Sequence, residues 1–382
     1  MSGVMRACYR LEAKAEEVEA RAEALLYEQT VELPPDAVRD PSVRREILAR
    51  LEGIEPDPAG GFRLHVAFPE LATAGDPAQV LNVLFGNSSM HADLELVGVS
   101  LPPGLAAVLG GPRLGVPGIR KLLDVHDRPL TCTALKPMGL PTEELAHLCQ
   151  AFARGGIDII KDDHGLAGHE TAPFEDRVRA CQDEVSEETA RSGRRILYAP
   201  NLIGTPSAVK RQLDFARGCG VQAVLVAPML LGLPLLVELA REAEGITLLA
   251  HPAFSGSQRI APAALFGTLL PAYGADAVIF PHAGGRFGFS LEDCGGIVRG
   301  LAAQPEGWPP ALPVPAGGMS VDRVEELLAF YGRDCMLLVG GSLYLAGPDL
   351  EERTRAFVAD VARIGGKAPR TGRAQAPALA AP

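Results

Sequence analysis

The stretch Gly156-Ile157-Asp158-Ile159-Ile160-Lys161-Asp162-Asp163-His164 changes abruptly from apolar to ionisable residues. Its β-branched isoleucines predict a fully buried strand, and four ionisable groups follow where that strand would leave its sheet. Such groups could form a solvated loop with a Lys–Asp ion pair. They also fit a divalent-metal site, because carboxylate oxygens suit Mg²⁺ and CO₂ could carbamylate the lysine, which turns a cation into a third carboxylate-like ligand.

From residue 130 onward, short apolar strands alternate with amphipathic helices. The predicted strands are Leu130–Lys136, Ile157–Lys161, Arg195–Ala199, Ala223–Ala227, Thr247–Ala250, Ala277–Phe280, Leu312–Pro315 and Met336–Val339. Helical patterns between them include Thr142–Arg154, Phe174–Arg191, Ala208–Arg217, Leu233–Glu242, Pro262–Tyr273, Val321–Tyr331 and Leu350–Ile364. Because strands that alternate with helices pair in parallel, eight such units in about 240 residues favour a closed (β/α)₈ barrel over an open doubly wound sheet.

The residues before this repeat have a different pattern, which predicts a small α+β domain. Strands are expected at 4–9, 62–68 and 94–101, and helices at 12–27, 42–51 and 77–84. The Gly- and Pro-rich stretch 110–118 predicts a linker. We therefore divide the chain into an N-terminal α+β domain at 1–125, a (β/α)₈ TIM-barrel catalytic domain at 126–367 and a disordered Ala/Pro-rich tail at 368–382.

Composition narrows the possible partners. The 382 residues are 47% hydrophobic, which is enough for a large core, and a net charge of −11 disfavours nucleic acid or an anionic membrane as a partner. The seven cysteines are odd in number and form no CxxC pair, which favours a reducing cytoplasm over a disulfide framework. No apolar run approaches the ~20 residues of a membrane helix, so we expect a soluble protein.

Active sites of (β/α)₈ barrels lie at the C-terminal ends of the strands, so the polar residues there are candidates. They are Lys136, Lys161, Asp162, Asp163, His164, Asn201, His251, His282 and Arg286. Lys136 either caps an exposed loop or, desolvated at the barrel mouth, serves as acid or base. Each histidine is either a hydrogen-bonded core residue or part of the site, and Arg286 either clamps a phosphate or forms a salt bridge to a helix.

Two glycine pairs follow the last two predicted strands. Gly317-Gly318 and Gly340-Gly341 would offer backbone N–H groups at helix starts, which is the usual phosphate position in such barrels. One pair alone fits an ordinary tight turn as well. Their presence after both strands favours a phosphate-binding site.

Several of these motifs together resemble the RuBisCO large-chain superfamily. They are Leu135-Lys136-Pro137, Gly156-Ile157-Asp158 leading into Lys161-Asp162-Asp163, the two strand-end histidines and the two glycine pairs. The resemblance covers nearly the whole chain, since Asn82-Val83, Leu101-Pro102-Pro103 and Arg128-Pro129-Leu130 resemble the family's domain junction. It implies Mg²⁺ as cofactor, held by Asp163 and by Lys161 as a carbamate derived from CO₂.

The resemblance also implies roles for further residues. Lys136 matches the lysine that handles the enolisation proton, and His251 and His282 match active-site histidines. The phosphate-binding glycines correspond to Gly317, Gly318, Gly340 and Gly341. Glu28 and Asn82 resemble residues that complete a neighbouring subunit's site, which implies a homodimer with shared active sites.

Four departures from the family pattern argue against CO₂ fixation. His164 stands where the family has a glutamate metal ligand, so it either binds the metal or shuttles protons. Met138 and Pro252 replace a lysine and an arginine. Gly288-Phe289 stands where RuBisCO presents a lysine to the nascent carboxylate, and without that cation the addition loses its main electrostatic stabiliser. The chain therefore resembles the non-carboxylating RuBisCO-like branch.

These features predict a Mg²⁺-dependent enzyme that enolises and isomerises a phosphorylated keto-sugar such as 5-methylthioribulose 1-phosphate. One alternative is a decarboxylase or hydrolase of a phosphorylated 3-oxo acid such as 3-oxo-isoapionate 4-phosphate, because losing CO₂ gives the same kind of enediolate. An alternative of another class is a non-catalytic binding or regulatory barrel. The presence of Lys136, Lys161 and Asp163 argues against it.

Overall fold

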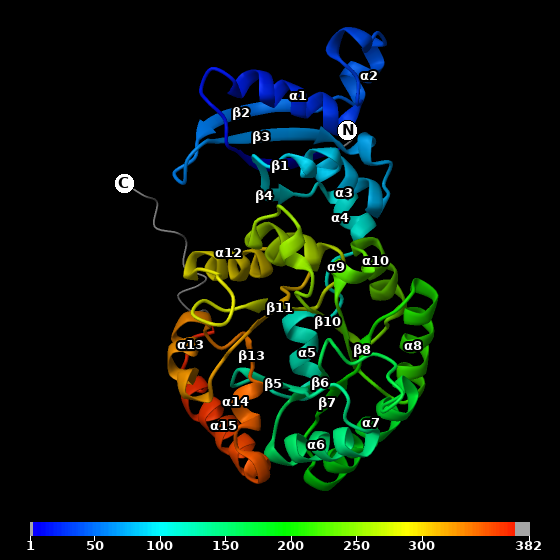
Figure 1. Ribbon diagram of the computed structural model, residues 1–382, viewed down its shortest axis with the longest axis vertical. Coiled ribbons are helices and arrows are strands. Elements are labelled where there is room, and N and C mark those ends of the chain that lie inside the picture. The colour runs from blue at the N-terminus through cyan, green and yellow to red at the C-terminus, as the bar shows by residue number, and fades with distance from the viewer. Residues whose placement is uncertain (1–2, 371–382) are drawn as a thin grey trace.

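The N-terminal part of the chain folds as a four-stranded antiparallel sheet in the order β2-β3-β1-β4. Its strands are β1 (Val4–Leu11), β2 (Arg50–Pro56), β3 (Phe62–Pro69) and β4 (Leu94–Ser100). Alternate residues of β1 are buried because one face of the sheet packs on helices α1 (Val18–Thr30) and α3 (Pro77–Phe85). The hydroxyl of Tyr9 in β1 donates to the carbonyl of Leu84 in α3, which ties the helix to the sheet. In this computed structural model, which describes residues 3–370, the sheet domain stands above the barrel (Figure 1).

Parts of this domain differ from the prediction. The helix expected at 12–27 begins only at Val18. The helix expected at 42–51 is the short α2 (Pro41–Glu46), which the Asp40 side chain caps by accepting the N–H of Ser42. Residues 50–56 pair with β3 as the edge strand β2, which the sequence pattern did not predict. Strand pairing depends on the neighbouring strand, so the pattern of one segment does not contain it.

The second part of the chain is a barrel of eight strand positions. Its strands are β5 (Leu130–Leu135), β6 (Ile159–Asp162), β7 (Leu197–Ala199), β8 (Asn201–Leu202), β9 (Ala223–Val226), β10 (Thr247–Ala250), β11 (Ala277–Pro281), β12 (Leu312–Ala316) and β13 (Met336–Leu338). They pair in parallel in the orders β13-β5-β6-β7 and β8-β9-β10-β11-β12, and β12 lies beside β13, which closes the barrel. The third position is split into β7 and β8 by Pro200, which has no N–H to donate to a neighbour.

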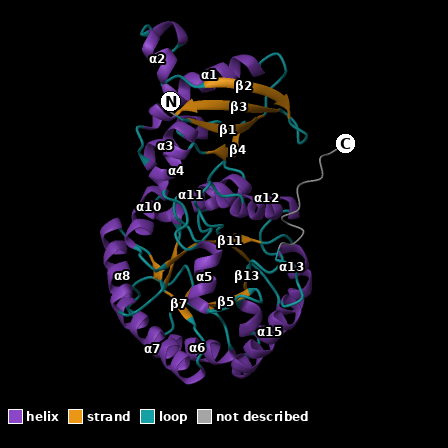
Figure 2. Ribbon diagram, turned by 180° about the vertical axis from the view of Figure 1, so that it is seen from behind, coloured by secondary structure: helices purple, strands orange, loops and turns teal. Residues whose placement is uncertain are grey.

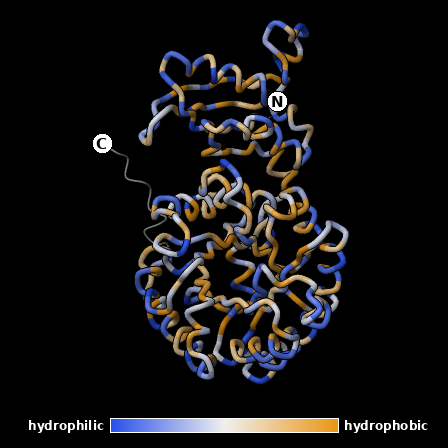
Figure 3. The backbone as a smooth tube through the Cα atoms, in the orientation of Figure 1, coloured by the Kyte–Doolittle hydropathy of each residue, from blue (hydrophilic) through white to orange (hydrophobic). Residues whose placement is uncertain are grey.

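Helices surround the barrel strands, as Figure 2 shows in purple around orange. They are α6 (Thr142–Gly155), α7 (Phe174–Ser192), α8 (Pro206–Gly218), α9 (Pro228–Leu231), α10 (Leu233–Glu242), α11 (Leu270–Ala272), α12 (Leu291–Ala302), α13 (Val324–Tyr331), α14 (Gly341–Tyr344) and α15 (Leu350–Gly365). The helix expected at 262–273 is mostly a π-helix at Ala263–Leu269. Hydrophobic segments run through the middle of the barrel, and hydrophilic segments are common on the outer helices (Figure 3).

The segment expected to be a linker contains two helices, α4 (Pro103–Leu109) and α5 (Gly115–Leu123). The α5 side chains Val116, Ile119 and Leu123 pack with Leu130 and other residues inside the barrel. The Asp276 carboxylate accepts the N–H groups of residues 113, 114 and 115 at 2.8, 2.6 and 3.0 Å, which fixes the start of α5. Helix α5 therefore covers the N-terminal end of the strands and packs with the barrel rather than with the sheet domain.

The predicted fold class is confirmed: an α/β chain with an N-terminal antiparallel sheet domain and a C-terminal barrel. None of the helices within residues 3–370 combines the length and apolar character that a membrane span needs. The tail predicted to be disordered lies mostly outside the described residues, since residues 371–382 are not described.

Candidate active site

A cavity of about 1120 Å³ opens at the C-terminal ends of the barrel strands, opposite α5. Its walls come from the segments that follow β5, β6, β10, β11, β12 and β13. Ten residues predicted from the sequence line it: Lys136, Lys161, Asp163, His164, His251, Arg286, Gly317, Gly318, Gly340 and Gly341. These residues are far apart in the chain, and the barrel brings them together.

The end of β6 places its ionisable side chains on two sides of the strand. Lys161 is 2% exposed and lines the cavity, where its Nζ lies 3.0 Å from the Asp162 carbonyl oxygen. Burial lowers the pKa of Lys161, which favours the neutral amine. Asp163 also lines the cavity, and its Oδ1 lies 2.9 Å from Nζ of Lys136. Burial opposes ionisation of Asp163, but hydrogen bonds from His164 and Lys136 lower its pKa well below the usual range.

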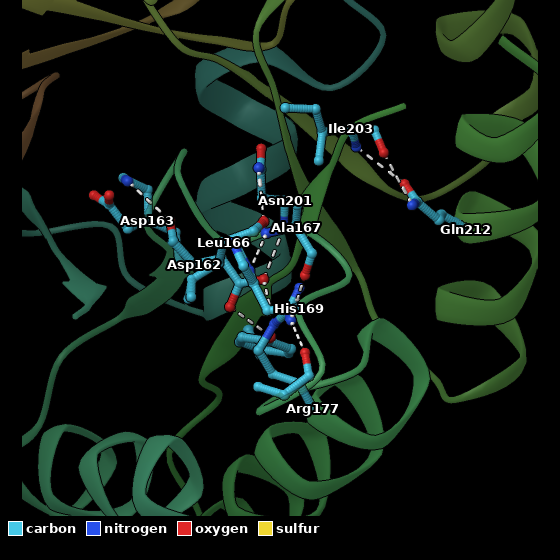
Figure 4. Close-up of polar contacts among 12 residues, drawn as sticks. Asp162, Asp163, Leu166, Ala167, His169, Arg177, Asn201, Ile203 and Gln212 are labelled. Atoms are coloured by element: carbon cyan, nitrogen blue, oxygen red, sulfur yellow. Dashed lines mark hydrogen bonds and ion pairs between the residues drawn. The ribbon is translucent and has the colours of Figure 1, made fainter. Parts of the chain in front are cut away.

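Asp162 points away from the cavity into a buried network (Figure 4). Its carboxylate accepts from Nε of Arg177 at 3.0 Å, the hydroxyl of Tyr198 at 2.7 Å and the backbone N–H of Asn201 at 3.0 Å. The Asn201 side chain donates to the carbonyls of His164 and Leu166, both at 3.0 Å. Asp162 and Asn201 therefore hold the loop that carries Asp163 and His164, and neither lines the cavity.

Two histidines stack on the floor of the cavity. The rings of His164 and His251 lie 4.2 Å apart between centroids and 14° from parallel. Burial, and then the charge of Lys161, lowers the pKa of His251 to about 2, so this ring is neutral at physiological pH. Nδ1 of His251 accepts the backbone N–H of Ala253 at 3.1 Å, so the proton of the neutral ring is on Nε2.

His282 is not brought to the cavity, although the sequence pattern grouped it with His251. Its ring is 2% exposed and packs against Phe330 and Tyr331 of α13, with Nδ1 2.6 Å from the Tyr331 hydroxyl. Burial, and then the charge of Arg323, lowers its pKa to about 4. A catalytic role for His282 stays a prediction that this position does not favour.

The glycine pair after β12 lies directly under the loop that follows β11. The Arg286 N–H donates to the carbonyl of Gly317 at 2.8 Å. A Cβ on Gly317 would lie 3.1 Å from the Phe287 ring, and one on Gly318 would lie 3.1 Å from Cγ of Arg286. Both glycines also have positive φ angles, 87° and 104°, so the close packing of the two loops requires glycine here.

One side of the cavity is apolar, and the sequence analysis did not predict it. It is formed by side chains after β10 and β11: Phe254, Ile260, Leu265, Phe266 and Phe289. Phe289 packs against Phe266 with ring centroids 5.9 Å apart. Phe254 is 62% exposed, although it stands in a loop directly after a barrel strand. An aromatic residue in a Ser- and Gly-rich loop at a strand end was the signal that could have located this side.

Comparison with known proteins identifies the family of this chain. Residues 115–260 match the family model described as "Ribulose bisphosphate carboxylase large chain, catalytic domain". The chain is 46% identical over 357 residues to "Ribulose bisphosphate carboxylase-like protein 1" of Rhodopseudomonas palustris, covering 94% of this chain and 97% of the relative. The chain belongs to the RuBisCO large-chain superfamily. Within that superfamily it is a RuBisCO-like protein of the non-carboxylating branch.

Other RuBisCO-like relatives carry names of activities. The "5-methylthioribulose-1-phosphate isomerase" of Rhodospirillum rubrum is 42% identical, with 95% of this chain and 97% of the relative covered. A "2,3-diketo-5-methylthiopentyl-1-phosphate enolase" of Geobacillus thermodenitrificans is 34% identical, with 73% of this chain and 70% of the relative covered. The crystal structure of a Rubisco-like protein from Rhodopseudomonas palustris matches with a TM-score of 0.88 at 40% identity, covering 96% of this chain and 99% of that one.

RuBisCO-family enzymes generally use Mg²⁺ with a carbamylated lysine, and the residues of this RuBisCO-like chain fit that group. Within residues 3–370, no three His, Cys, Asp or Glu side chains lie together as a ready-made metal site. Asp163 and His164 line the cavity together with Lys161, which as a carbamate would add a third ligand. The buried amine of Lys161, with its lowered pKa, is suited to react with CO₂ and provide that ligand.

The two predicted site residues of the small domain lie away from this cavity. Glu28 is on α1, where Oε1 accepts from the Asn87 side chain at 3.0 Å. Asn82 is exposed on α3, and its side chain donates to Gln79 at 3.2 Å. Neither residue lines the cavity within the described part of this RuBisCO-like chain. Their assignment to a neighbouring subunit's site stays a prediction.

Proposed function

We propose that this protein is an isomerase that enolises 5-methylthioribulose 1-phosphate or a closely related ketose monophosphate with Mg²⁺. That the chain is an enzyme of the enolase or isomerase type follows from its relatives. The observation that carries the finer proposal is the division of one cavity into three parts. A lysine- and carboxylate-bearing floor, a glycine-rich end and an apolar side all face the same space.

The floor carries the groups that would move a proton beside a carbonyl. The Lys136 side chain is 38% exposed and lines the cavity, and its amine lies 2.9 Å from Oδ1 of Asp163, so it can reach a substrate and exchange a proton with it. Neutral His251 has a proton on Nε2 to donate in a hydrogen bond, because its Nδ1 is engaged by Ala253. Mg²⁺ held by carbamylated Lys161, Asp163 and His164 would polarise the substrate's carbonyl.

The rest of the cavity favours a ketose with one phosphate and an apolar end. The glycine pairs after β12 and β13 offer backbone N–H groups for one phosphate, and Arg286 lies beside them. The segments after β10 and β11 contribute Phe254, Phe266 and Phe289. A second phosphate against these rings would lose its solvation without gaining a partner, whereas a methylthio group is favoured there.

The test is proton NMR in D₂O with 5-methylthioribulose 1-phosphate. We expect deuterium to enter the position beside the carbonyl and an isomeric product to form. In Lys136→Ala both should slow by at least about 100-fold, because general acid–base catalysis typically contributes that much. The matched control is Lys210→Ala on the outer helix α8, which should keep the wild-type rate.

A parallel assay with ribulose 1,5-bisphosphate and labelled CO₂ should show no fixation. Losing one electrostatic contact to a developing charge typically costs ~10²–10³-fold in rate, and by the family resemblance Phe289, which packs against Phe266, stands in place of the lysine that makes this contact. Sustained fixation would contradict the proposal. Release of CO₂ from a phosphorylated 3-oxo acid, without isomerisation of the ketose, would favour the decarboxylase instead.

A further inference from the structure

Tyr344 connects the segment after β13 with the segment that carries Lys136. It is the last residue of α14, the short helix that begins at Gly341 in the second glycine pair. Its hydroxyl accepts the backbone N–H of Lys136 at 2.9 Å and donates to the carbonyl of Ala134 at 3.0 Å. One hydroxyl therefore binds the backbone on both sides of Leu135, at the end of β5.

The position of this contact matters because β5 ends at Leu135. The last bond of its pairing with the neighbouring segment is the one in which the Asp163 N–H donates to the Leu135 carbonyl. Lys136 is the next residue and lies beyond the strand. Its backbone N–H donates to the Tyr344 hydroxyl. Without that hydroxyl, the backbone of Lys136 would lose its acceptor in the described part of the chain.

The ring of Tyr344 is itself held in place. It packs edge-on against Phe152 of α6, with centroids 5.4 Å apart and planes at 77°. Burial raises the pKa of Tyr344, so the hydroxyl stays protonated and keeps donating at neutral pH. On the other side, Cε of Lys136 lies 3.8 Å from the place that a Cβ on Gly340 would occupy. The segment after β13 therefore borders both the backbone and the side chain of Lys136.

We propose that Tyr344 is the positioning residue of Lys136, which fixes where the lysine amine stands beside Asp163 and the substrate. The role of Lys136 as the proton-transferring group rests on the proposed function. The contact itself is independent of the substrate, and the two can be tested separately. Tyr344 does not line the cavity itself, so it acts through the backbone of residues 134–136 that its hydroxyl binds.

The first experiment compares Tyr344→Phe with wild type in the deuterium-exchange assay. The variant keeps the ring against Phe152 and removes the hydroxyl. We expect kcat to fall about 10- to 100-fold with KM within twofold, because a small displacement of a catalytic group slows the reaction without weakening binding. The matched control is Tyr273→Phe, which removes a hydroxyl bonded to the Pro77 carbonyl at 2.7 Å, and which should leave both constants unchanged. An unchanged kcat in Tyr344→Phe would overturn the proposal.

The second experiment needs no substrate. The amine of Lys136 is labelled with trinitrobenzenesulfonate, and the rate is measured by mass spectrometry relative to Lys210 in the same sample. We expect labelling of Lys136 to be several-fold faster in Tyr344→Phe, because the loosened backbone frees the amine from Asp163 more often. Equal rates in wild type, Tyr344→Phe and Tyr273→Phe would overturn the proposal. If the wild type exchanges no deuterium, the proposed function fails while this measurement still decides the role of Tyr344.

Discussion

Burial lowers the pKa values of three side chains around the barrel mouth. Desolvation disfavours the charged forms of Lys161, His251 and His282, and it is the largest contribution to the lowered pKa of each. The consequence of the lowered pKa depends on what surrounds each side chain. Lys161 faces the cavity, where a neutral amine can react with CO₂, whereas His282 faces α13, where its neutral ring packs against Tyr331 and shares a hydrogen bond with the Tyr331 hydroxyl.

For Lys161 we predict that Mg²⁺ affinity depends on CO₂. Isothermal titration of wild type should show tighter binding with bicarbonate than without it, because only the carbamate adds a third ligand to Asp163 and His164. In Lys161→Ala the bicarbonate effect should vanish, while Lys210→Ala should behave as wild type. Equal Mg²⁺ affinity of wild type with and without bicarbonate would exclude the carbamate.

For His282 we predict a loss of stability as pH falls from about 6.5 to about 4. The folded ring has its pKa lowered to about 4, so the unfolded chain binds a proton in this window and the folded chain does not. At pH 5.5, one unit below the ordinary histidine pKa of about 6.5, this lowers the free energy of unfolding by about 1.4 kcal/mol.

The measurement is urea unfolding at pH 7.5 and 5.5. The decrease between the two pH values should be smaller by that amount in His282→Asn than in wild type. His147→Asn, which changes an exposed histidine of α6, should keep the wild-type decrease. A decrease in His282→Asn as large as in wild type would show that this ring is protonated in the folded protein.

At the scale of elements, β6 and its following loop depend on one buried ion pair. Arg177 of α7 and Asp162 of β6 are both fully buried, and Nε lies 3.0 Å from Oδ2. Nη1 of Arg177 also donates to the carbonyls of Ala167 and Ala172, at 2.8 and 2.7 Å. One guanidinium thus joins the strand end to the middle of the loop and to its C-terminal end.

We therefore predict that Arg177→Met lowers the free energy of unfolding by about 3–5 kcal/mol, because it leaves the Asp162 carboxylate buried without its partner charge. The matched control is Arg179→Met on the same helix, whose exposed pairs with Glu175 and Asp176 are both 3.6 Å long. It should cost less than about 1 kcal/mol. Comparable losses in urea unfolding of the two variants would mean that the buried pair adds little.

The elements differ in how far the sequence predicts them. Each barrel strand begins within two residues of its predicted start, because a buried parallel strand is a continuous apolar run bounded by loop residues. Strand β2 was missed because its pairing with β3 is a property of two segments. The segment of helix α5 was predicted to be a linker because glycine and proline are typical of loops. The role of its apolar residues is evident only once the barrel residues against which they pack are known.

The residues of the candidate site could also be predicted from the sequence only in part. Its strand-end residues could be collected from the sequence, since barrel topology brings all strand ends together. The sequence does not predict which of these side chains face the cavity. Asp162, Asn201 and His282 stand beside residues of the cavity but point into the packing around it, and the apolar side chains after β10 carry no polar signature.

At the scale of the whole molecule, Glu28 and Asn82 of the small domain do not line the cavity of their own chain within residues 3–370. We predict a homodimer in which each barrel uses these residues of the partner. Mixing inactive Glu28→Ala with inactive Lys161→Ala should restore activity, because one of the two sites in a mixed dimer would be intact. Glu23→Ala, an exposed change on the same helix, should be active by itself. No recovery after confirmed subunit exchange would place the complete site within one chain.

The barrel domain begins before helix α5, which the order of the segments along the chain does not indicate. The helix precedes the barrel in sequence, yet Val116, Ile119 and Leu123 fill the end of the barrel opposite the cavity, and Asp276 binds its first residues. A barrel cut free at residue 126 would open to water at its base, with Leu130 and Cys132 exposed. Any exchange of small domains between relatives of this protein therefore has to join the chains before residue 113, so that each barrel keeps its own helix α5.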